Sequence, residues 1–220
     1  MSARLVALCG IDGVGKSTQA ANLVAWAREG GLRADTLWCR WDPWLARPAI
    51  SLLNRYSRGG AASGPAASDH SRRRGFKQRV LSIAPLRAAW RGLMVLDYGI
   101  RTSVRVRRAR RSVDLLILDR YWHDVIVDLS AGGEMAKPPR LLTLLLPKPD
   151  LVLVLELPEE EAIVRQPDAL DLTHLRQRRR LYGVIATQPD AALVDASGSQ
   201  DAVSEAVRAA AMPVLPRTGP

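Results

Sequence analysis

One eight-residue segment constrains this chain more than any other. Residues 10–17 read Gly-Ile-Asp-Gly-Val-Gly-Lys-Ser and match the pattern G-x-x-x-x-G-K-[ST]. A short apolar run at residues 5–8 precedes the segment, and apolar residues recur at helical spacing after it, over residues 16–28. The sequence therefore predicts a β-strand, a glycine-rich loop and a helix in direct succession.

A loop of this kind binds phosphate through its backbone. Its glycines let successive N–H groups face an anion, and the N-terminus of the following helix adds more unpaired N–H groups. As a catalytic residue, Lys16 can reach the β- and γ-phosphates of a nucleotide, and the Ser17 hydroxyl can contact Mg²⁺. The ATP-binding residues expected in this segment are Gly10, Ile11, Asp12, Gly13, Val14, Gly15, Lys16, Ser17 and Thr18.

Apolar runs alternate with helical patterns along the rest of the chain. Further strands are expected at residues 36–40, 113–118, 151–155 and 192–194. Further helices are expected at residues 121–129, 140–146, 158–165, 170–186 and 200–211. Residues 72–112 are mostly helical in pattern, with a break near Pro85.

This alternation of strands and helices predicts an α/β fold. We expect a single domain over residues 1–212, with a five-stranded parallel sheet flanked by helices. Within it, the glycine-rich stretch at about 58–71 is expected to be a mobile loop. Residues 213–220 are expected to form a flexible tail.

The chain has a formal net charge of +10, and one segment carries the excess. Residues 72–111 hold thirteen Arg and Lys residues and a single acid, Asp97. Such a segment is either a solvated helix face or a contact for an acidic partner: nucleotide phosphates, nucleic acid or anionic lipid. No nucleic-acid-binding motif or zinc spacing accompanies it, so nucleic acid is not an expected partner.

The cellular compartment is inferred from what the sequence lacks. The two cysteines, Cys9 and Cys39, are too few for a disulfide framework and suit a reducing compartment. Residues 1–10 lack the features of a secretory signal, and the apolar runs are too short to span a bilayer. We therefore expect a cytoplasmic protein that makes no membrane contact.

A second motif follows the apolar run at residues 113–118. Asp119-Arg120-Tyr121 comes where a buried strand would end, which is the sheet edge at which ligands bind in such folds. There Asp119 would hold Mg²⁺ together with the Ser17 hydroxyl, and it is a catalytic candidate for that reason. The alternative is that Asp119 only caps the next helix.

The two motifs resemble those of the thymidylate kinase family. The first is similar to the family's loop in its acid at the third position and in the Thr18-Gln19 pair that follows Ser17. The second resembles the family's Asp-Arg-Tyr motif. Weaker similarities cover residues 148–160, Arg165, the Arg-rich stretch 176–182 and the loop 194–199. Together they span most of residues 4–210.

The resemblance implies that residues 1–212 form a single P-loop kinase domain with a lid region at about 166–180. It implies an ATP-dependent kinase that uses Mg²⁺ and takes dTMP as the first guess for its acceptor. Arg120 would be a catalytic residue that holds the acceptor phosphate and the transferring group, Arg176 would supply lid charge at ATP, and Ser197 would lie in the loop that touches adenine. Homodimers are common in the family. The acceptor-binding residues implied in this way are Asp12, Arg40, Tyr98, Arg101, Arg120 and Tyr121.

One departure from the family concerns the acceptor side. Where the family carries Arg-Glu-Pro-Gly, this chain reads Arg40-Trp41-Asp42-Pro43-Trp44, and the tryptophans either wall a different acceptor pocket or simply pack. Two alternatives to a nucleoside-monophosphate kinase therefore stay open. One is a kinase for a sugar, nucleoside or other metabolite on the same fold. The other is a non-kinase protein that binds ATP or nucleic acid.

Overall fold

The structure is a computed structural model of the 220-residue chain. It describes residues 3–40, 84–130, 138–166 and 172–216, together with residues 42, 44, 47, 48 and 51. The expected mobile loop at 58–71, residues 167–171 of the expected lid, and the end of the expected tail at 217–220 lie outside the described residues.

The described elements confirm the predicted α/β fold. The five strands are β1 (Arg4–Cys9), β2 (Ala34–Trp38), β3 (Leu115–Asp119), β4 (Leu151–Glu156) and β5 (Ala191–Asp195). The helices are α1 (Lys16–Glu29), α4 (Ala84–Ala109), α5 (Trp122–Leu129), α6 (Arg140–Leu145), α7 (Glu159–Arg165), α8 (Leu172–Ala186) and α9 (Gln200–Ala211), followed by the 3₁₀ turn η1 (Met212–Val214). Most boundaries lie within two residues of the expected ones.

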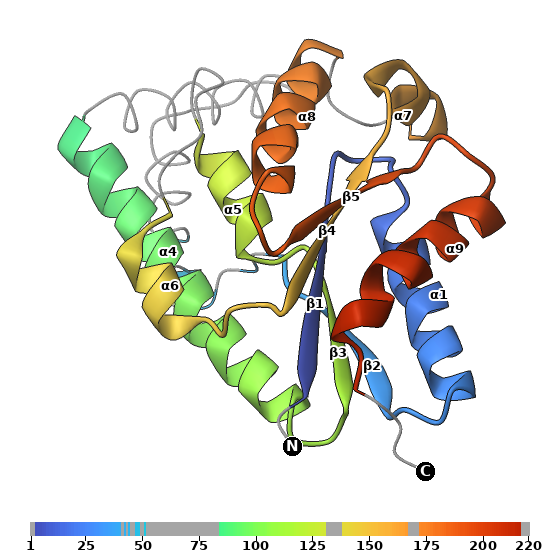
Figure 1. Ribbon diagram of the computed structural model, residues 1–220. Coiled ribbons are helices and arrows are strands. Elements are labelled where there is room, and N and C mark those ends of the chain that lie inside the picture. Colours follow the sequence, from blue (N-terminus) through green and yellow to red (C-terminus); the bar gives the residue numbers. More distant parts are fainter. Residues whose placement is uncertain are drawn as a thin grey trace, which may run out of the picture. The chain divides into compact units, whose positions relative to one another are not determined.

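All five strands are parallel and run in the order β2-β3-β1-β4-β5 (Figure 1). The chain moves from β1 to one side of the sheet to form β2, and from β3 it crosses to the other side to form β4. The direction of winding therefore changes next to β1, and ligands bind at such a point, beyond the carboxyl ends of the strands. Register pairs Leu8 with Asp119, which brings the two sequence motifs to neighbouring strand ends.

The core explains why the central strands are continuous apolar runs. Helices α1 and α9 cover one face of the sheet, and α5 and α8 cover the other (Figure 1). Strands between two helical layers bury both faces, and every residue of β3 is buried. A strand at the sheet's edge is covered less, and Leu193 of β5 is 52% exposed.

Residues 41–102 and 139–145 form a second compact unit, distinct from the one that contains the sheet. Within it, α4 and α6 approach closely at Gly99, where an added Cβ would lie 2.9 Å from Leu145 Cδ1. Pro85 lies in the first turn of α4, a position that proline tolerates. The single domain over residues 1–212 stays a prediction.

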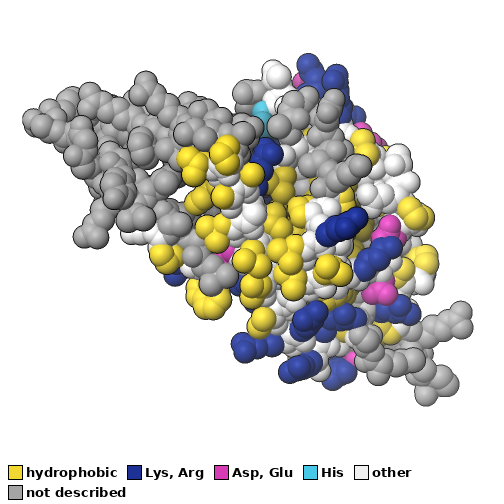
Figure 2. All heavy atoms as spheres, turned by 90° about the vertical axis from the view of Figure 1, so that its left-hand side faces the viewer, with side chains coloured by type: hydrophobic (Ala, Val, Ile, Leu, Met, Phe, Trp, Pro, Cys, Tyr) yellow, Lys and Arg dark blue, Asp and Glu magenta, His cyan; other side chains and the backbone are white. Residues whose placement is uncertain are grey.

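The basic character of the chain is visible at the surface. Half-buried or exposed arginines follow one another at the end of α4 and just after it, at positions 105, 107, 108, 110 and 111. On the face shown in Figure 2, Lys and Arg side chains are more plentiful than Asp and Glu side chains. None of the helices in the described residues is both long enough and apolar enough to cross a bilayer.

Candidate active site

The loop between β1 and α1 has a backbone that only glycine accommodates at two points. Gly10 has φ +146° and Gly13 has φ +85°. A Cβ on Gly10 would lie 2.5 Å from the Leu155 carbonyl oxygen, and one on Gly13 would lie 2.5 Å from the Ala162 carbonyl oxygen. The glycines therefore let the loop pass close to the backbone of β4 and α7 while it curls around a phosphate-sized space.

We expect Gly13→Ala to damage both the fold and nucleotide binding. The new methyl group must displace the loop from α7, and the positive φ adds strain, which together lower the free energy of unfolding by about 2 kcal/mol or more. Mg-ATP affinity, measured by titration calorimetry, should fall at least about tenfold as the N–H groups lose their alignment. Wild-type stability and affinity in this variant would contradict the geometry described.

Gly183→Ala is the matched control for that substitution. Gly183 lies inside α8, and a Cβ there would meet nothing within 4 Å. Alanine in an open helical position stabilises a protein by about 0.5–1 kcal/mol relative to glycine. The control should therefore unfold at a slightly higher temperature and bind Mg-ATP as the wild type does.

The loop and the start of α1 line a cavity of about 260 Å³. Gly15, Lys16, Ser17 and Thr18 contribute the first turn of α1 and its cap, which carries no acidic residue. The positive end of the helix dipole thus faces the cavity without local neutralisation. Two arginines also line it, Arg120 from the end of β3 and Arg165 from the end of α7. The cavity has the charge and the donors that a polyphosphate requires.

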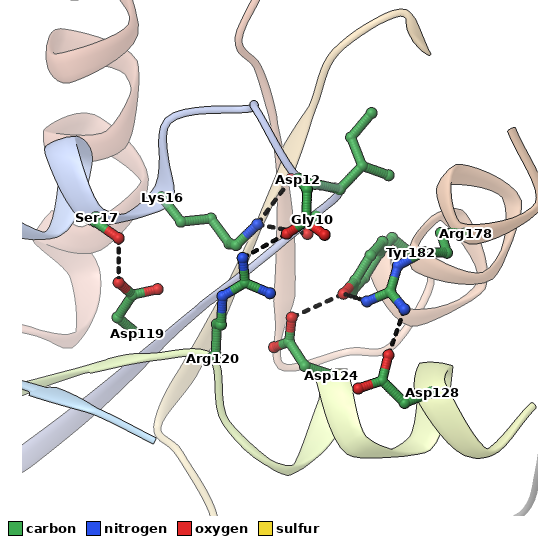
Figure 3. Close-up of polar contacts among 11 residues, drawn as sticks. Gly10, Asp12, Lys16, Ser17, Asp119, Arg120, Asp124, Asp128, Arg178 and Tyr182 are labelled. Carbon is green, nitrogen blue, oxygen red and sulfur yellow. Dashed lines mark hydrogen bonds and ion pairs between the residues drawn. The ribbon is translucent and has the colours of Figure 1, made fainter. Parts of the chain in front are cut away.

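Lys16 folds back over the loop in this structure. Its side chain is buried, and Nζ donates to the carbonyl oxygens of Gly10 and Ile11, each at 2.7 Å (Figure 3). Burial lowers the pKa of Lys16 to about 8, and the charge of Asp124 acts in the opposite direction. An arriving phosphate would offer Nζ an anionic acceptor that is stronger than either carbonyl.

Ser17 and Asp119 meet across the neighbouring strand ends. Ser17 Oγ donates to Asp119 Oδ2 at 2.5 Å, while Asp119 Oδ1 is buried and has no hydrogen-bond partner among the described residues. A buried carboxylate oxygen without a partner is costly unless something binds it. Mg²⁺ prefers oxygen ligands of this kind, so the residues present fit a magnesium ion.

Arg120 has a strained backbone and a partner in the loop. Its φ of +61° lies in a region that non-glycine residues rarely adopt. Its guanidinium donates to Asp12 Oδ1, and both side chains are largely buried (Figure 3). Burial alone would raise the pKa of Asp12, but the hydrogen bond and charge of Arg120 outweigh it, and the pKa lies below its ordinary value. Strain held in this way is typical of functional sites.

Sequence reasoning missed a further group of residues beside the site. Asp124 lies in the first turn of α5 and is buried, and its Oδ1 accepts a hydrogen bond from Tyr182 of α8 at 2.7 Å. Arg178 donates to the Tyr182 hydroxyl at 3.2 Å and also pairs with Asp128 (Figure 3). Burial raises the pKa of Asp124 to about 6, although Lys16 acts to lower it. An acid one turn after Asp119-Arg120-Tyr121 was the signal available in the sequence.

Arg176, which was expected to supply lid charge, pairs with acids instead, and so does Arg179 of the same Arg-rich stretch. Arg176 Nε donates to Glu159 Oε1 at 2.6 Å, and Arg179 pairs with Glu156 and Glu159. These contacts join α8 to α7 and to the end of β4. The arginine that lines the cavity from this side is Arg165, whose Nη1 donates to the Ala196 carbonyl oxygen at 3.2 Å.

The remaining candidate residues fall in several places. Tyr121 is fully buried, and its hydroxyl donates to the Pro147 carbonyl oxygen at 2.9 Å, which leaves no surface for an acceptor. Arg40 is exposed just after β2. Ser197 is exposed after β5, and its N–H donates to Asp195 at 2.9 Å. Tyr98 and Arg101 belong to the second unit, and Tyr98 is buried there.

Comparisons with known proteins add one relative. The chain is 26% identical over 209 residues to a protein of Saccharolobus solfataricus named "Probable thymidylate kinase 1". The match is nearly end to end. It covers 92% of this chain and 93% of that protein. No family model matches the chain.

Proposed function

We propose that this protein is an ATP-dependent kinase that transfers the γ-phosphoryl group to a nucleoside monophosphate, with dTMP as the first acceptor to test. The observation that carries the proposal is the convergence of Lys16, the Ser17–Asp119 pair and Arg120 around one cavity. These groups supply the cations and the metal ligands that phosphoryl transfer uses.

The protein's own residues would act mainly by position and charge. The loop N–H groups and the start of α1 hold the triphosphate, and Lys16 moves from its carbonyl partners to the phosphates. Ser17 and Asp119 would hold Mg²⁺, which neutralises charge on the terminal phosphates. Arg120 stabilises the charge that spreads over the transferring oxygens. An acceptor phosphate is already anionic, so no strong base is required.

The choice of dTMP depends on the relative and on the sequence resemblance. The similar protein is named a probable thymidylate kinase, and the match covers 92% of this chain. The Asp12–Arg120 pair lies beside the cavity, where it could orient an acceptor. ATP and Mg²⁺ are the expected cofactors for the same reasons.

A second acceptor class is favoured by a contact in the second unit. Arg101, the arginine expected to bind a nucleoside monophosphate, donates to the carbonyl oxygen and the carboxylate of Asp42, both at 2.6 Å. An acceptor phosphate would have to displace that carboxylate. A sugar or nucleoside hydroxyl would not need the arginine.

The test is ADP production from Mg-ATP across a panel of acceptors: dTMP, the other nucleoside monophosphates, nucleosides and simple sugars. We expect turnover with dTMP well above the rate without acceptor. Turnover with a nucleoside or a sugar instead would identify the second acceptor class. No acceptor-dependent ADP with any compound, in a protein that binds Mg-ATP, would contradict the kinase proposal.

A further inference from the structure

A buried carboxylate lies near the glycine-rich loop of residues 10–17, and no step of the proposed transfer requires it. Asp124 is 5% exposed, in a position between Arg120 and Tyr182 and below Gly10 and Asp12 (Figure 3). Its Oδ2 atom is buried and has no hydrogen-bond partner among the described residues. Burying a carboxylate with a hydrogen bond to only one of its oxygens costs folding free energy. We therefore expect a functional role that would offset this cost.

The side chains around Asp124 come from four parts of the fold. Lys16 of α1 and Arg120 after β3 are the cations of the site, and each has its protonated form favoured by the charge of Asp124. The charge of Arg178 on α8 lowers the pKa of Asp124. The charge of Asp124 in turn helps to raise the pKa of Cys9 on β1. Among the charges that favour protonated Lys16, Asp124 is the strongest. The negative charge of Asp124 therefore acts on both Lys16 and Arg120.

A chain of contacts fixes Asp124 to α8. The Tyr182 hydroxyl donates to Asp124 and accepts from Arg178, which in turn pairs with Asp128. The two acids are one helical turn apart on α5, so the contacts close a ring between α5 and α8. Such a ring leaves the Asp124 side chain little freedom to turn away from the loop.

We propose that Asp124 is a positioning residue, whose buried negative charge, held in place by Tyr182, orients Lys16 and Arg120 toward the transferring phosphates. The two cations repel each other, and the pKa of Lys16 is lowered by Arg120 as well as by burial. The negative charge of Asp124 offsets this repulsion, so Lys16 and Arg120 can stay on the same side of the cavity. The proposal rests on the proposed kinase function and adds a residue to its site.

The decisive variant is Asp124→Asn, which keeps the shape and an acceptor for Tyr182 but removes the charge. We expect the kcat of phosphoryl transfer to fall roughly ten- to hundredfold, the usual range for a residue that orients a catalytic group. Mg-ATP should bind at least as tightly as in the wild type, because a negative charge near the triphosphate has been removed. A loss in kcat without a loss in affinity is the signature of positioning.

Thermal stability separates this role from a structural one. The pKa of Asp124 is raised to about 6 in the folded protein, so its ionisation opposes folding. That penalty develops as the pH rises through the ordinary carboxyl range toward 6, and it is complete at pH 8. Asp124→Asn lacks the penalty, so at pH 8 it should unfold at the wild-type temperature or above it.

Two further variants serve as a comparison and a control. Tyr182→Phe removes the hydrogen bond that helps keep Asp124 ionised, so its activity should begin to fall at a higher pH than that of the wild type. The wild-type rate should fall near pH 6, and Asp124→Asn should lack that step. Asp35→Asn makes the same chemical change at an exposed position on β2 and should leave the rate unchanged.

Three outcomes would overturn the proposal: unchanged turnover in Asp124→Asn, a wild-type pH step retained in that variant, or a joint loss of turnover, Mg-ATP affinity and stability.

If the wild type phosphorylates no acceptor, the kinase proposal fails separately. Mg-ATP affinity between pH 5 and 8 then tests Asp124 by itself. Tighter binding of the wild type below about pH 6, absent in Asp124→Asn, would support the role. Identical pH dependence in both proteins would overturn it.

Discussion

Lys16→Ala is expected to reduce phosphoryl transfer at least about a thousandfold. The substitution removes the one lysine that lines the phosphate cavity among the described residues, and with it the charge that meets the terminal phosphates. Single-turnover assays with saturating Mg-ATP measure the loss directly. Alanine also leaves the Gly10 and Ile11 carbonyl oxygens without the donor they have in the structure.

The fold should survive this change. Lys16 is a buried cation, so its removal also removes a desolvation cost, and the midpoint of thermal unfolding should move by less than about 5 °C. The matched control is Lys148→Ala, because Lys148 is 75% exposed and pairs with Asp190 away from the cavity. The control should turn over at the wild-type rate. Substantial turnover in Lys16→Ala would contradict the assignment of the cavity.

Arg120→Ala is expected to lower kcat roughly a hundred- to ten-thousandfold. The guanidinium lines the cavity and is held by Asp12, and a cation placed in this way stabilises charge that develops on the transferring group. The variant also leaves Asp12 without its partner. Because Arg120 is proposed to act in the transition state, kcat should fall more than Mg-ATP affinity does.

The unusual backbone of Arg120 supplies a second, independent test. At φ +61° alanine keeps the strain, whereas glycine adopts this conformation at little cost. Arg120→Gly should therefore be as inactive as Arg120→Ala but more stable by about 1 kcal/mol in chemical denaturation.

A surface arginine provides the control for both Arg120 variants. Arg33→Ala removes a largely exposed arginine that pairs with Asp114, and it should leave turnover unchanged. Wild-type turnover in either Arg120 variant would remove Arg120 from the site.

The fold and the glycine-rich loop at residues 10–17 could be predicted because local sequence encodes them. The apolar run at residues 115–118 has the length of a buried strand. The loop needs glycine at positions 10 and 13 because its backbone adopts a positive φ there, and this requirement involves only a few neighbouring residues. The pairing of Ser17 with Asp119 followed from two motifs that end neighbouring parallel strands.

The side-chain pairings around α8 could not be predicted in the same way. Whether an arginine in 176–180 meets ATP or an acid depends on how α8 packs against α5 and α7, which no local pattern specifies. In the structure Arg176 and Arg179 meet glutamates, and Arg178 meets Asp128. The burial of Tyr121 could not be predicted for a similar reason. Its hydroxyl donates to the carbonyl oxygen of Pro147, which is distant in sequence, and the motif does not indicate this contact.

The measurement that most directly tests the central claim is the fate of the label when the protein is incubated with [γ-³²P]ATP, Mg²⁺ and dTMP. The account predicts that the label appears in dTDP, that its appearance requires Mg²⁺, and that Lys16→Ala abolishes it while Lys148→Ala does not. Label that stays in ATP or appears only as inorganic phosphate, with dTMP and with every other acceptor of the panel, would contradict phosphoryl transfer at this site.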